Sequence, residues 1–231
     1  MVKYIYDPAG RIKEVLDGNG KAATYRYDAA GHILERMLQS GVKTEYSYGQ
    51  DGRLEGLIHS DAAGKIDEFS YSYDPAGNRT GIDRTRRQAD GSDETARYGY
   101  SYDPVNRLQG VSRNGTALRS YAYDALGNRK MMEDFEKGLA TEYEYDPLNR
   151  LVRTSGADGE RVFDYDKRGN MVSVSLDGVL EKSFAFGAAN KMASASRADG
   201  STAAYSYDGL GQRVKSVWDV EGATGGNPAH I

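Results

Sequence analysis

The sequence predicts an all-β protein, an antiparallel β-hairpin repeat array whose curved or spiralling sheet is open at both ends. The first observation is a short phrase, an aromatic pair followed usually by Asp and a turn, that returns ten times at intervals near 21 residues. Periodicity over a whole chain indicates repeats. The second is composition, because 18 Tyr and 28 Gly in 231 residues favour Tyr-rich strands separated by Gly turns. The third is that no interval keeps the apolar spacing of an amphipathic helix.

The aromatic pair marks the strand that enters each turn. In Tyr25-Arg26-Tyr27 both rings lie on one face of a strand and Arg26 lies on the other, because side chains alternate. If neighbouring repeats stack in register, we expect two continuous aromatic ladders, each cross-strand pair adding about 0.2–1 kcal/mol. The second aromatics, which we predict to be structural, are Tyr6, Tyr27, Tyr48, Tyr73, Tyr102, Tyr123, Tyr145, Tyr165, Phe186 and Tyr207.

The turn after each pair has the chemistry of a type I turn. Asp7-Pro8-Ala9-Gly10 places Asp first, Pro second and Gly fourth. The carboxylate is expected to accept backbone N–H groups, and Gly or Asn to adopt the positive φ of a bulged hairpin. The predicted structural turn residues are Asp7, Gly10, Asp28, Gly31, Asp74, Gly77, Asp103, Asn106, Asp124, Gly127, Asp146, Asn149, Asp166, Gly169, Asp208 and Gly211; Gly49 and Gly187 replace Asp in the other two units.

A second turn follows about ten residues later in most units. Pairs such as Asp17-Gly18 and Asp177-Gly178 indicate it, so each unit is strand, tight turn, strand, tight turn. Lys137-Gly138 indicates such a turn too, and Met131 to Leu139 is the one stretch in which a short helical turn could form.

Two longer repeats locate insertions. The steps of 25 and 29 residues place one insertion in Leu57–Glu68 and the other in Arg84–Arg97, where we expect loops that extend into solvent.

The repeats set the expected domain organisation. Residues 1–218 form the array of about ten units, with Trp218 packed on the last one, and 219–231 form a Gly-rich linker or a truncated continuation. Because both ends would present unpaired strand edges, the chain is expected to be a segment of something larger.

Composition excludes several function classes. A formal net charge of −4 gives no basic field for phosphate backbones, so nucleic acid is not expected as a partner. The chain has no Cys, which excludes disulfides and thiolate metal sites. No apolar run approaches the roughly 20 residues of a membrane-spanning helix, and no secretory leader begins at Met1.

The phrase Tyr-Asp-x-x-Gly-Asn-Arg, seen at Tyr73–Arg79 and Tyr123–Arg129, resembles the YD repeat of the RHS (rearrangement hot spot) proteins. Similar repeats occur in toxin-complex C components and in teneurins. The resemblance covers about Tyr4 to Trp218, nearly the whole chain. It implies a β-ribbon that spirals into a hollow shell which, in bacterial members, encloses a C-terminal toxin and is exported or surface-exposed.

The resemblance therefore implies a non-enzymatic structural segment of a secreted or cell-surface protein. Its partners would be the remainder of a larger RHS chain and the enclosed toxin. The family's self-cleavage motif, of the Asp-Pro-x-Gly-Leu type, is absent, so self-cleavage does not carry over. The alternative is a cell-surface adhesion or carbohydrate-binding module that uses the aromatic face or the hairpin loops.

No catalytic, cofactor-binding or metal-binding residue is predicted. The turn acids are read as turn caps in preference to calcium ligands, because no EF-hand or related repeat is present. Glu133 and Asp134 are adjacent and point to opposite faces of a strand, which disfavours a glycosidase pair. The histidines His32, His59 and His230 lack zinc-site spacing, and Arg84, Arg86 and Arg87 lie among acids as a solvated loop would.

Overall fold

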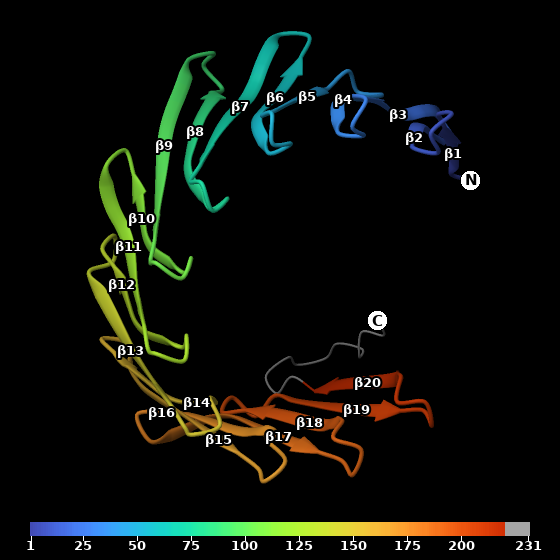
Figure 1. Cartoon of the computed structure of the whole chain (residues 1–231). Helices are drawn as coiled ribbons and strands as arrows, with labels where there is room; N and C mark the ends of the chain where they lie inside the picture. Colours follow the sequence, from blue (N-terminus) through green and yellow to red (C-terminus); the bar gives the residue numbers. More distant parts are fainter. Residues whose placement is uncertain (220–231) are drawn as a thin grey trace. The chain divides into compact units, whose positions relative to one another are not determined.

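The computed structural model describes residues 1–219, and every regular element in that part of the chain is a β-strand. The chain divides into two compact units, Met1–Ser120 and Tyr121–Ile231. Figure 1 shows both as antiparallel strands joined by short turns. The all-β, hairpin-repeat prediction is confirmed.

The first unit holds ten strands and most of the eleventh. Each strand pairs antiparallel with its neighbour along the chain, from β1–β2 through β9 and β10 to β10–β11. The strands are β1 Lys3–Tyr6, β2 Ile12–Asp17, β3 Gly20–Tyr27, β4 Ile33–Leu38, β5 Lys43–Tyr48, β6 Leu54–Asp61, β7 Gly64–Tyr73, β8 Arg79–Arg87, β9 Asp93–Tyr102, β10 Leu108–Arg113 and β11 Thr116–Tyr123.

The second unit repeats the same plan. Its consecutive strands also pair antiparallel, from β12–β13 to β19–β20. They are β12 Arg129–Asp134, β13 Leu139–Tyr145, β14 Leu151–Gly156, β15 Gly159–Tyr165, β16 Met171–Leu176, β17 Val179–Phe186, β18 Met192–Arg197, β19 Thr202–Tyr207 and β20 Arg213–Asp219.

A β-bulge recurs beside the second aromatic of the repeats. Ile5 pairs with Glu14 but Tyr6 pairs with Ile12, so one residue of the outgoing strand is extra. The same shift occurs before Tyr27, Tyr48, Tyr73, Tyr145, Tyr165, Phe186 and Tyr207. Because a bulge bends its strand and increases local twist, the repeated bulges account for the bend of the sheet within each unit (Figure 1).

The hydrophobic core is small for so long a chain. Within residues 1–219 the buried hydrophobic side chains are Ala23, Ala96, Val174 and Ala203, all small. The tyrosines of the inner repeats are half-buried instead. Stability must therefore come mainly from contacts between adjacent repeats, as in other repeat arrays.

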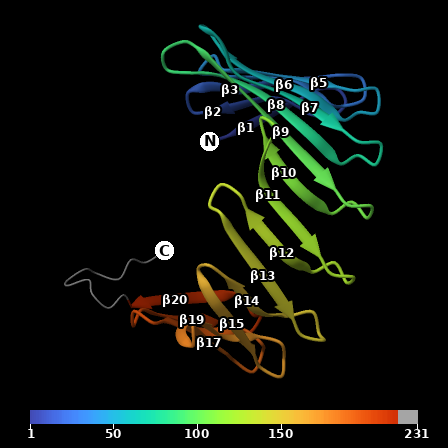
Figure 2. The same ribbon diagram turned by 90° about the vertical axis from the view of Figure 1, so that its left-hand side faces the viewer.

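Three sequence expectations need correction. No helical turn forms at Met131–Leu139: Arg129–Asp134 is strand β12, and 135–138 is the tight turn that leads to β13. Leu57–Glu68 and Arg84–Arg97 lengthen the hairpins β6–β7 and β8–β9 and add no long loop, as Figure 2 shows. Their polar residues are used in cross-strand pairs, such as Arg84 with Asp67 at 2.6 Å, which stabilise longer strands.

The expected linker at 219–231 falls almost wholly outside the described residues, and the division into an array over 1–218 and a linker remains a prediction. Within residues 1–219, β1 pairs only with β2 and β20 only with β19, so both are edge strands. Trp218, on β20, meets Tyr205 edge to face at 6.1 Å between ring centroids and is 57% exposed.

Candidate functional site, a ladder of turns between repeats

The turn acid organises each turn. Asp7 Oδ1 accepts the backbone N–H groups of Ala9 and Arg11, both at 2.9 Å. Gly10 N–H donates to the Asp7 carbonyl at 3.0 Å, and Gly10 has φ 78°. The other units repeat this geometry with Gly or with Asn, as at Asn106 and Asn149, whose φ values are 65° and 60°. The predicted turn residues thus lie together in pairs, one pair in each of the eight repeats that carry a turn acid.

The repeat that starts at Gly49 shows how a missing turn acid is replaced. A Cβ on Gly49 would stand 2.5 Å from Glu55 Oε1, so an Asp at this position would require the Glu55 side chain to move. Asp51, two residues later, accepts the Arg53 N–H at 3.1 Å and pairs with Arg53 Nε at 3.2 Å. The carboxylate has moved within the turn and still binds the same residue.

Hydrogen bonding lowers the pKa of the turn carboxyls. The backbone N–H of Arg11 lowers the pKa of Asp7, and the side-chain amide of Asn78 does so for Asp74, in both cases against the opposing effect of partial burial. The same direction holds for Asp28, Asp103, Asp124, Asp146 and Asp166. Such acids are held ionised, as structural anions.

The fourth residue after the turn-acid position joins each repeat to the next, and we call it the bridging residue. Arg11 Nε binds its own Asp7 at 2.7 Å, while its NH1 donates to the Asp28 carbonyl of the next turn at 3.0 Å. Its guanidinium also lies 4.6 Å from the ring centroid of Tyr27. The bridging residues at the nine junctions are Arg11, His32, Arg53, Asn78, Arg107, Asn128, Arg150, Asn170 and Lys191.

Cationic bridging residues stack on the second aromatic of the following repeat. Arg53 lies 5.7 Å from the Tyr73 ring, Arg150 4.7 Å from Tyr165, and Lys191 6.0 Å from Tyr207. His32 stacks on Tyr48 at 4.7 Å. At the Arg and Lys junctions the expected ladder of aromatic rings is instead a ladder in which cations and rings alternate, because a cation over a π face adds electrostatic attraction to packing. At the His32 junction the imidazole ring takes the place of the cation.

The tyrosine hydroxyls form a second link between repeats. Tyr27 Oη donates to the Ile12 carbonyl at 2.7 Å, across to the outgoing strand of the preceding repeat. The equivalent bonds of Tyr48, Tyr73, Tyr102, Tyr145, Tyr165 and Tyr207 measure 2.7–3.1 Å. Phe186 occupies the same position without a hydroxyl.

Asn bridging residues use another geometry. Asn78 Nδ2 donates to its own Asp74 at 2.9 Å and to Asn106 Oδ1 of the next turn at 2.7 Å. Asn128 and Asn170 make the same contact with Asn149 and Asn190 at 3.1 and 2.7 Å. The receiving Asn stands each time at the positive-φ position.

The two geometries give a pairing rule along the chain. Wherever the bridging residue is Asn, the next positive-φ residue is Asn; wherever it is Arg, His or Lys, that residue is Gly. All nine junctions obey it. At Gly52, Gly77 and Gly211 a Cβ would come within 3.0–3.3 Å of the bridging His32, Arg53 or Lys191, so a side chain there would displace the cation.

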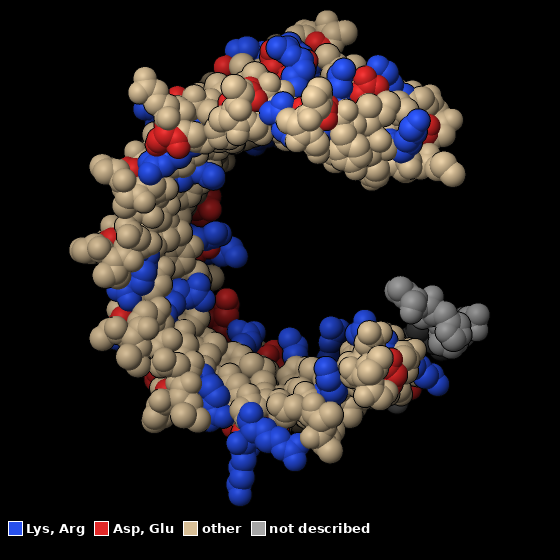
Figure 3. Space-filling view, turned by 45° about the vertical axis from the view of Figure 1, so that its right-hand side comes forward, with Lys and Arg blue, Asp and Glu red and all other residues tan. Residues whose placement is uncertain are grey.

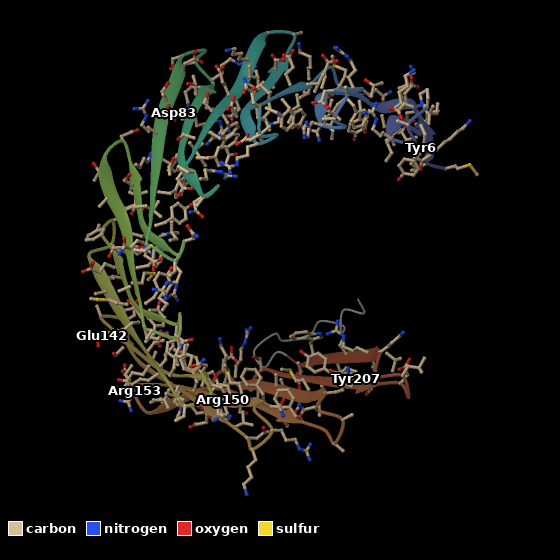
Figure 4. The ribbon with its side chains drawn as sticks, in the orientation of Figure 1. Tyr6, Asp83, Glu142, Arg150, Arg153 and Tyr207 are labelled. Carbon is tan, nitrogen blue, oxygen red and sulfur yellow. The ribbon has the colours of Figure 1, made fainter. Side chains whose placement is uncertain are left out.

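The two faces of the sheet differ in chemistry (Figure 4). In the second unit Arg150 and Tyr207 lie on one face, and Glu142 and Arg153 on the other. The latter face carries cross-strand ion pairs, such as Arg153–Glu144 at 3.5 Å and, in the first unit, Arg97–Asp83 at 2.6 Å. Figure 3 shows acidic and basic side chains interspersed along both units.

The Arg and His side chains that could form other kinds of site make contacts within the sheet. Arg84 and Arg87 form ion pairs with Asp67 and Asp61, both at 2.6 Å. His59 Nδ1 lies 3.0 Å from the buried Thr44 hydroxyl, and His230 is outside the described residues. Within residues 1–219 no group of three His, Asp or Glu side chains is placed to hold a metal ion, and no helix is long and apolar enough to cross a membrane.

Comparison with solved structures finds chains of similar fold but low identity. A TcdB2–TccC3 crystal structure is 14% identical with a TM-score of 0.47, covering 95% of this chain and 18% of that one. The same complex without its hypervariable C-terminal region is 14% identical with a TM-score of 0.48, covering 96% of this chain and 18% of that one. The Photorhabdus luminescens Tc holotoxin pore is 14% identical with a TM-score of 0.45, covering 95% of this chain and 17% of that one. This chain thus spans about a fifth of their length.

Comparison with sequences identifies the family. No curated protein sequence matches the chain. The RHS Repeat model matches residues 6–37, within the first two repeats. The Teneurin YD-shell model matches residues 65–222, more than half of the chain. The chain therefore belongs to the Teneurin YD-shell family of RHS and YD-repeat proteins.

Proposed function

We propose that the chain is a non-enzymatic wall segment of a YD-repeat shell, part of a larger secreted or cell-surface protein whose shell encloses a C-terminal toxin or other cargo. The proposal is supported by the contacts that the recurring residues of each repeat make. The bridging residue and the tyrosine hydroxyl bind the adjacent repeat, as in Arg11 with Asp28 and Tyr27 with Ile12, and the turn acid holds the bridging residue in place, as Asp7 holds Arg11. Repeats whose recurring residues hold their neighbours in this way form a continuous wall.

The chemistry of the turn acids supports the same function. A general acid needs a raised pKa, whereas those of Asp7, Asp146 and the acids like them are lowered by hydrogen bonds inside the turn. The family is a structural repeat family, which agrees with this role.

Protease protection tests the proposal. The whole natural reading frame that contains this chain would be expressed, its cargo identified by mass spectrometry, and the intact protein treated with protease before and after the wall is opened in urea. We expect cargo that is resistant in the closed state and digested in the opened one, with a hollow particle in cryo-electron micrographs. Cargo digested equally in both states, or a particle without a lumen, contradicts enclosure.

One feature favours carbohydrate binding as a second candidate function. A groove of about 390 Å³ in the second unit is lined by Phe184, Tyr205 and Trp218 together with Lys182, Arg197 and Asp199. Aromatic faces beside polar side chains suit a sugar ring. Arg213 lies 5.6 Å from the Tyr205 ring centroid, just as cations lie over Tyr27 and Tyr165 elsewhere, so among the described residues of the groove Phe184 and Trp218 are the aromatic residues without a cation over them.

A glycan array tests the second candidate. Binding that is abolished by Trp218→Ala, with an unchanged thermal unfolding midpoint, would support a sugar site in this groove. An array with no bound glycan removes the candidate and leaves the wall proposal unaffected.

A further inference from the structure

Strand β1 presents an edge that carries half of a repeat junction. Tyr6 is 56% exposed and Tyr4 is 50% exposed, whereas the second aromatics of the other nine repeats are all half-buried. Among the described residues β1 pairs with β2 alone. The surface therefore offers a strand edge, an open tyrosine face and the turn Asp7–Arg11 side by side.

We propose that the β1 edge is a docking surface for the outgoing strand of another YD-type repeat, and that it selects a repeat whose bridging residue is the cation Arg or Lys over one with Asn. The inference rests on the proposed function in one respect, that further YD-type repeats lie against this chain. It goes beyond that function by naming the chemistry of the repeat that fits.

The selection follows from the turn of the first repeat. Its positive-φ residue is Gly10, and every later Gly at this position is preceded by Arg, His or Lys as the bridging residue. An Asn bridging residue would need the amide oxygen of an Asn, as Asn78 finds at Asn106. Gly10 has no side chain to supply one.

Tyr6 and Asp7 complete the receptor for a cation. Inside the chain the Tyr27 ring receives Arg11 at 4.6 Å, and the Asp28 carbonyl accepts its NH1 at 3.0 Å. Tyr6 and the Asp7 carbonyl are the same two groups one repeat earlier. The exposed Tyr6 hydroxyl matches those that bind the preceding outgoing strand, as Tyr27 binds Ile12 at 2.7 Å.

A second copy of this chain is a poorer partner. Among residues 1–219, the outgoing strand that pairs on one edge alone is β20, and its preceding turn carries Gln212 at the bridging position. Gln carries no positive charge to place over the Tyr6 ring, and its side chain is longer than the Asn side chain used at the Asn junctions. The rule therefore disfavours end-to-end pairing of identical chains.

A fusion series tests the selection in the full chain. Met1–Lys3 are replaced by a copy of residues 3–24, which is joined directly to Tyr4. Thr24 of the copy is then followed by Tyr4–Tyr6, just as Thr24 is followed by Tyr25–Tyr27 in the natural chain, so the strand register is kept. The copied bridging residue is Arg11, or carries Arg11→Lys, Arg11→Asn or Arg11→Ala. Hydrogen exchange of the β1 amides is measured in each fusion and in the unfused chain.

We expect the Arg and Lys fusions to slow β1 exchange the most, by about threefold or more relative to the Ala fusion, from a cation–π contact of about 0.5–1 kcal/mol or more. The Asn fusion should match the Ala fusion. Gly10→Asn in the original repeat should slow exchange in the Asn fusion and speed it in the Arg fusion. Urea midpoints of every fusion show that the array is folded.

Two results overturn the inference in different ways. Equal protection by all four fusions shows that the edge accepts a repeat without selecting a cation, and the wall proposal stands. Protection by none shows that β1 does not receive a repeat, and both proposals fail.

Discussion

The hydroxyl of the second tyrosine is the smallest group that joins one repeat to the next. Tyr165 Oη donates to the Leu151 carbonyl at 2.9 Å. We expect Tyr165→Phe to lower the free energy of unfolding by about 0.5–1.5 kcal/mol, the net value of one hydrogen bond. Phe186→Tyr should raise it by a similar amount, because Met171 stands where Leu151 stands one repeat earlier. Urea unfolding measures both.

The exposed edge residue provides the control for this pair. Tyr6→Phe should leave the urea midpoint unchanged, because Tyr6 is 56% exposed. If Tyr165→Phe behaved like Tyr6→Phe, the hydroxyl would carry no stability.

The turn acids make stability depend on pH in a defined direction. The pKa values of seven of them are lowered in the folded chain from the ordinary 3.8, chiefly by hydrogen bonds such as Arg150 N–H to Asp146; the seven are Asp7, Asp28, Asp74, Asp103, Asp124, Asp146 and Asp166. A group with a lowered pKa contributes stability that is complete above its unfolded pKa and is lost as the pH falls through its folded value. We therefore expect this contribution to be constant from pH 5 to pH 7 and to decline below pH of about 4.

Replacing one acid tests the assignment. Asp146→Asn should lower the urea midpoint at pH 7, because Arg150 loses its carboxylate partner at 2.6 Å. The variant should also lose less stability than the parent between pH 7 and pH 3. An identical acid decline in both proteins would place the titrating groups elsewhere.

At the scale of the element, the junction between hairpins is the unit of specificity. Asn78 and Asn106 are bonded at 2.7 Å across one junction. We expect Asn78→Arg and Asn106→Gly each to cost about 1 kcal/mol, and the double variant to recover most of the loss, since Arg with Gly is the combination used at other junctions. A double-mutant cycle of urea midpoints gives the coupling energy.

A mismatched pair supplies the control. Asn78→Arg combined with Asn149→Gly changes the same residue types but at two different junctions, because Asn149 receives Asn128. That pair should show no recovery. If the losses of unfolding free energy in the matched pair were purely additive, the pairing rule would reflect the ancestry of the repeats and not an interaction energy between the two residues.

At the scale of the whole molecule, the array should tolerate the loss of a complete repeat, because each repeat contacts only its neighbours along the sheet. Deletion of Ile12–His32 brings Arg11 before Gly52 and keeps the rule. Deletion of Arg129–Arg150 brings Asn128 before Gly169 and breaks it. Both chains should keep a β-sheet circular dichroism spectrum.

The two deletions should differ in stability. We expect the deletion that keeps the rule to have the higher urea midpoint, and both to have a smaller denaturant dependence than the parent, because less surface is exposed on unfolding. Loss of structure in both would show that the array is one indivisible unit.

Much of the fold could be predicted from sequence because its determinants are local. The aromatic alternation and the turn at Asp7–Gly10 place strand ends within a few residues, since side-chain period and positive φ act inside a single hairpin. The two insertions lie where the sequence predicts them, but they lengthen hairpins and do not form loops. Whether polar residues such as Arg84 and Asp67 extend a hairpin depends on the partner that each meets across strands.

The sequence by itself determined the repeat, its hairpins and the family, because these follow from periodicity and from turn chemistry within about 21 residues. Only the tertiary structure decided what the repeats share. The recurrence of Arg, His, Lys or Asn after nine of the ten turns is visible in the sequence. A side chain such as Arg11, however, takes its role from Tyr27 and Asp28, which lie beside it only after the strands pair. That pairing also replaced a ladder of rings by one of cations and rings.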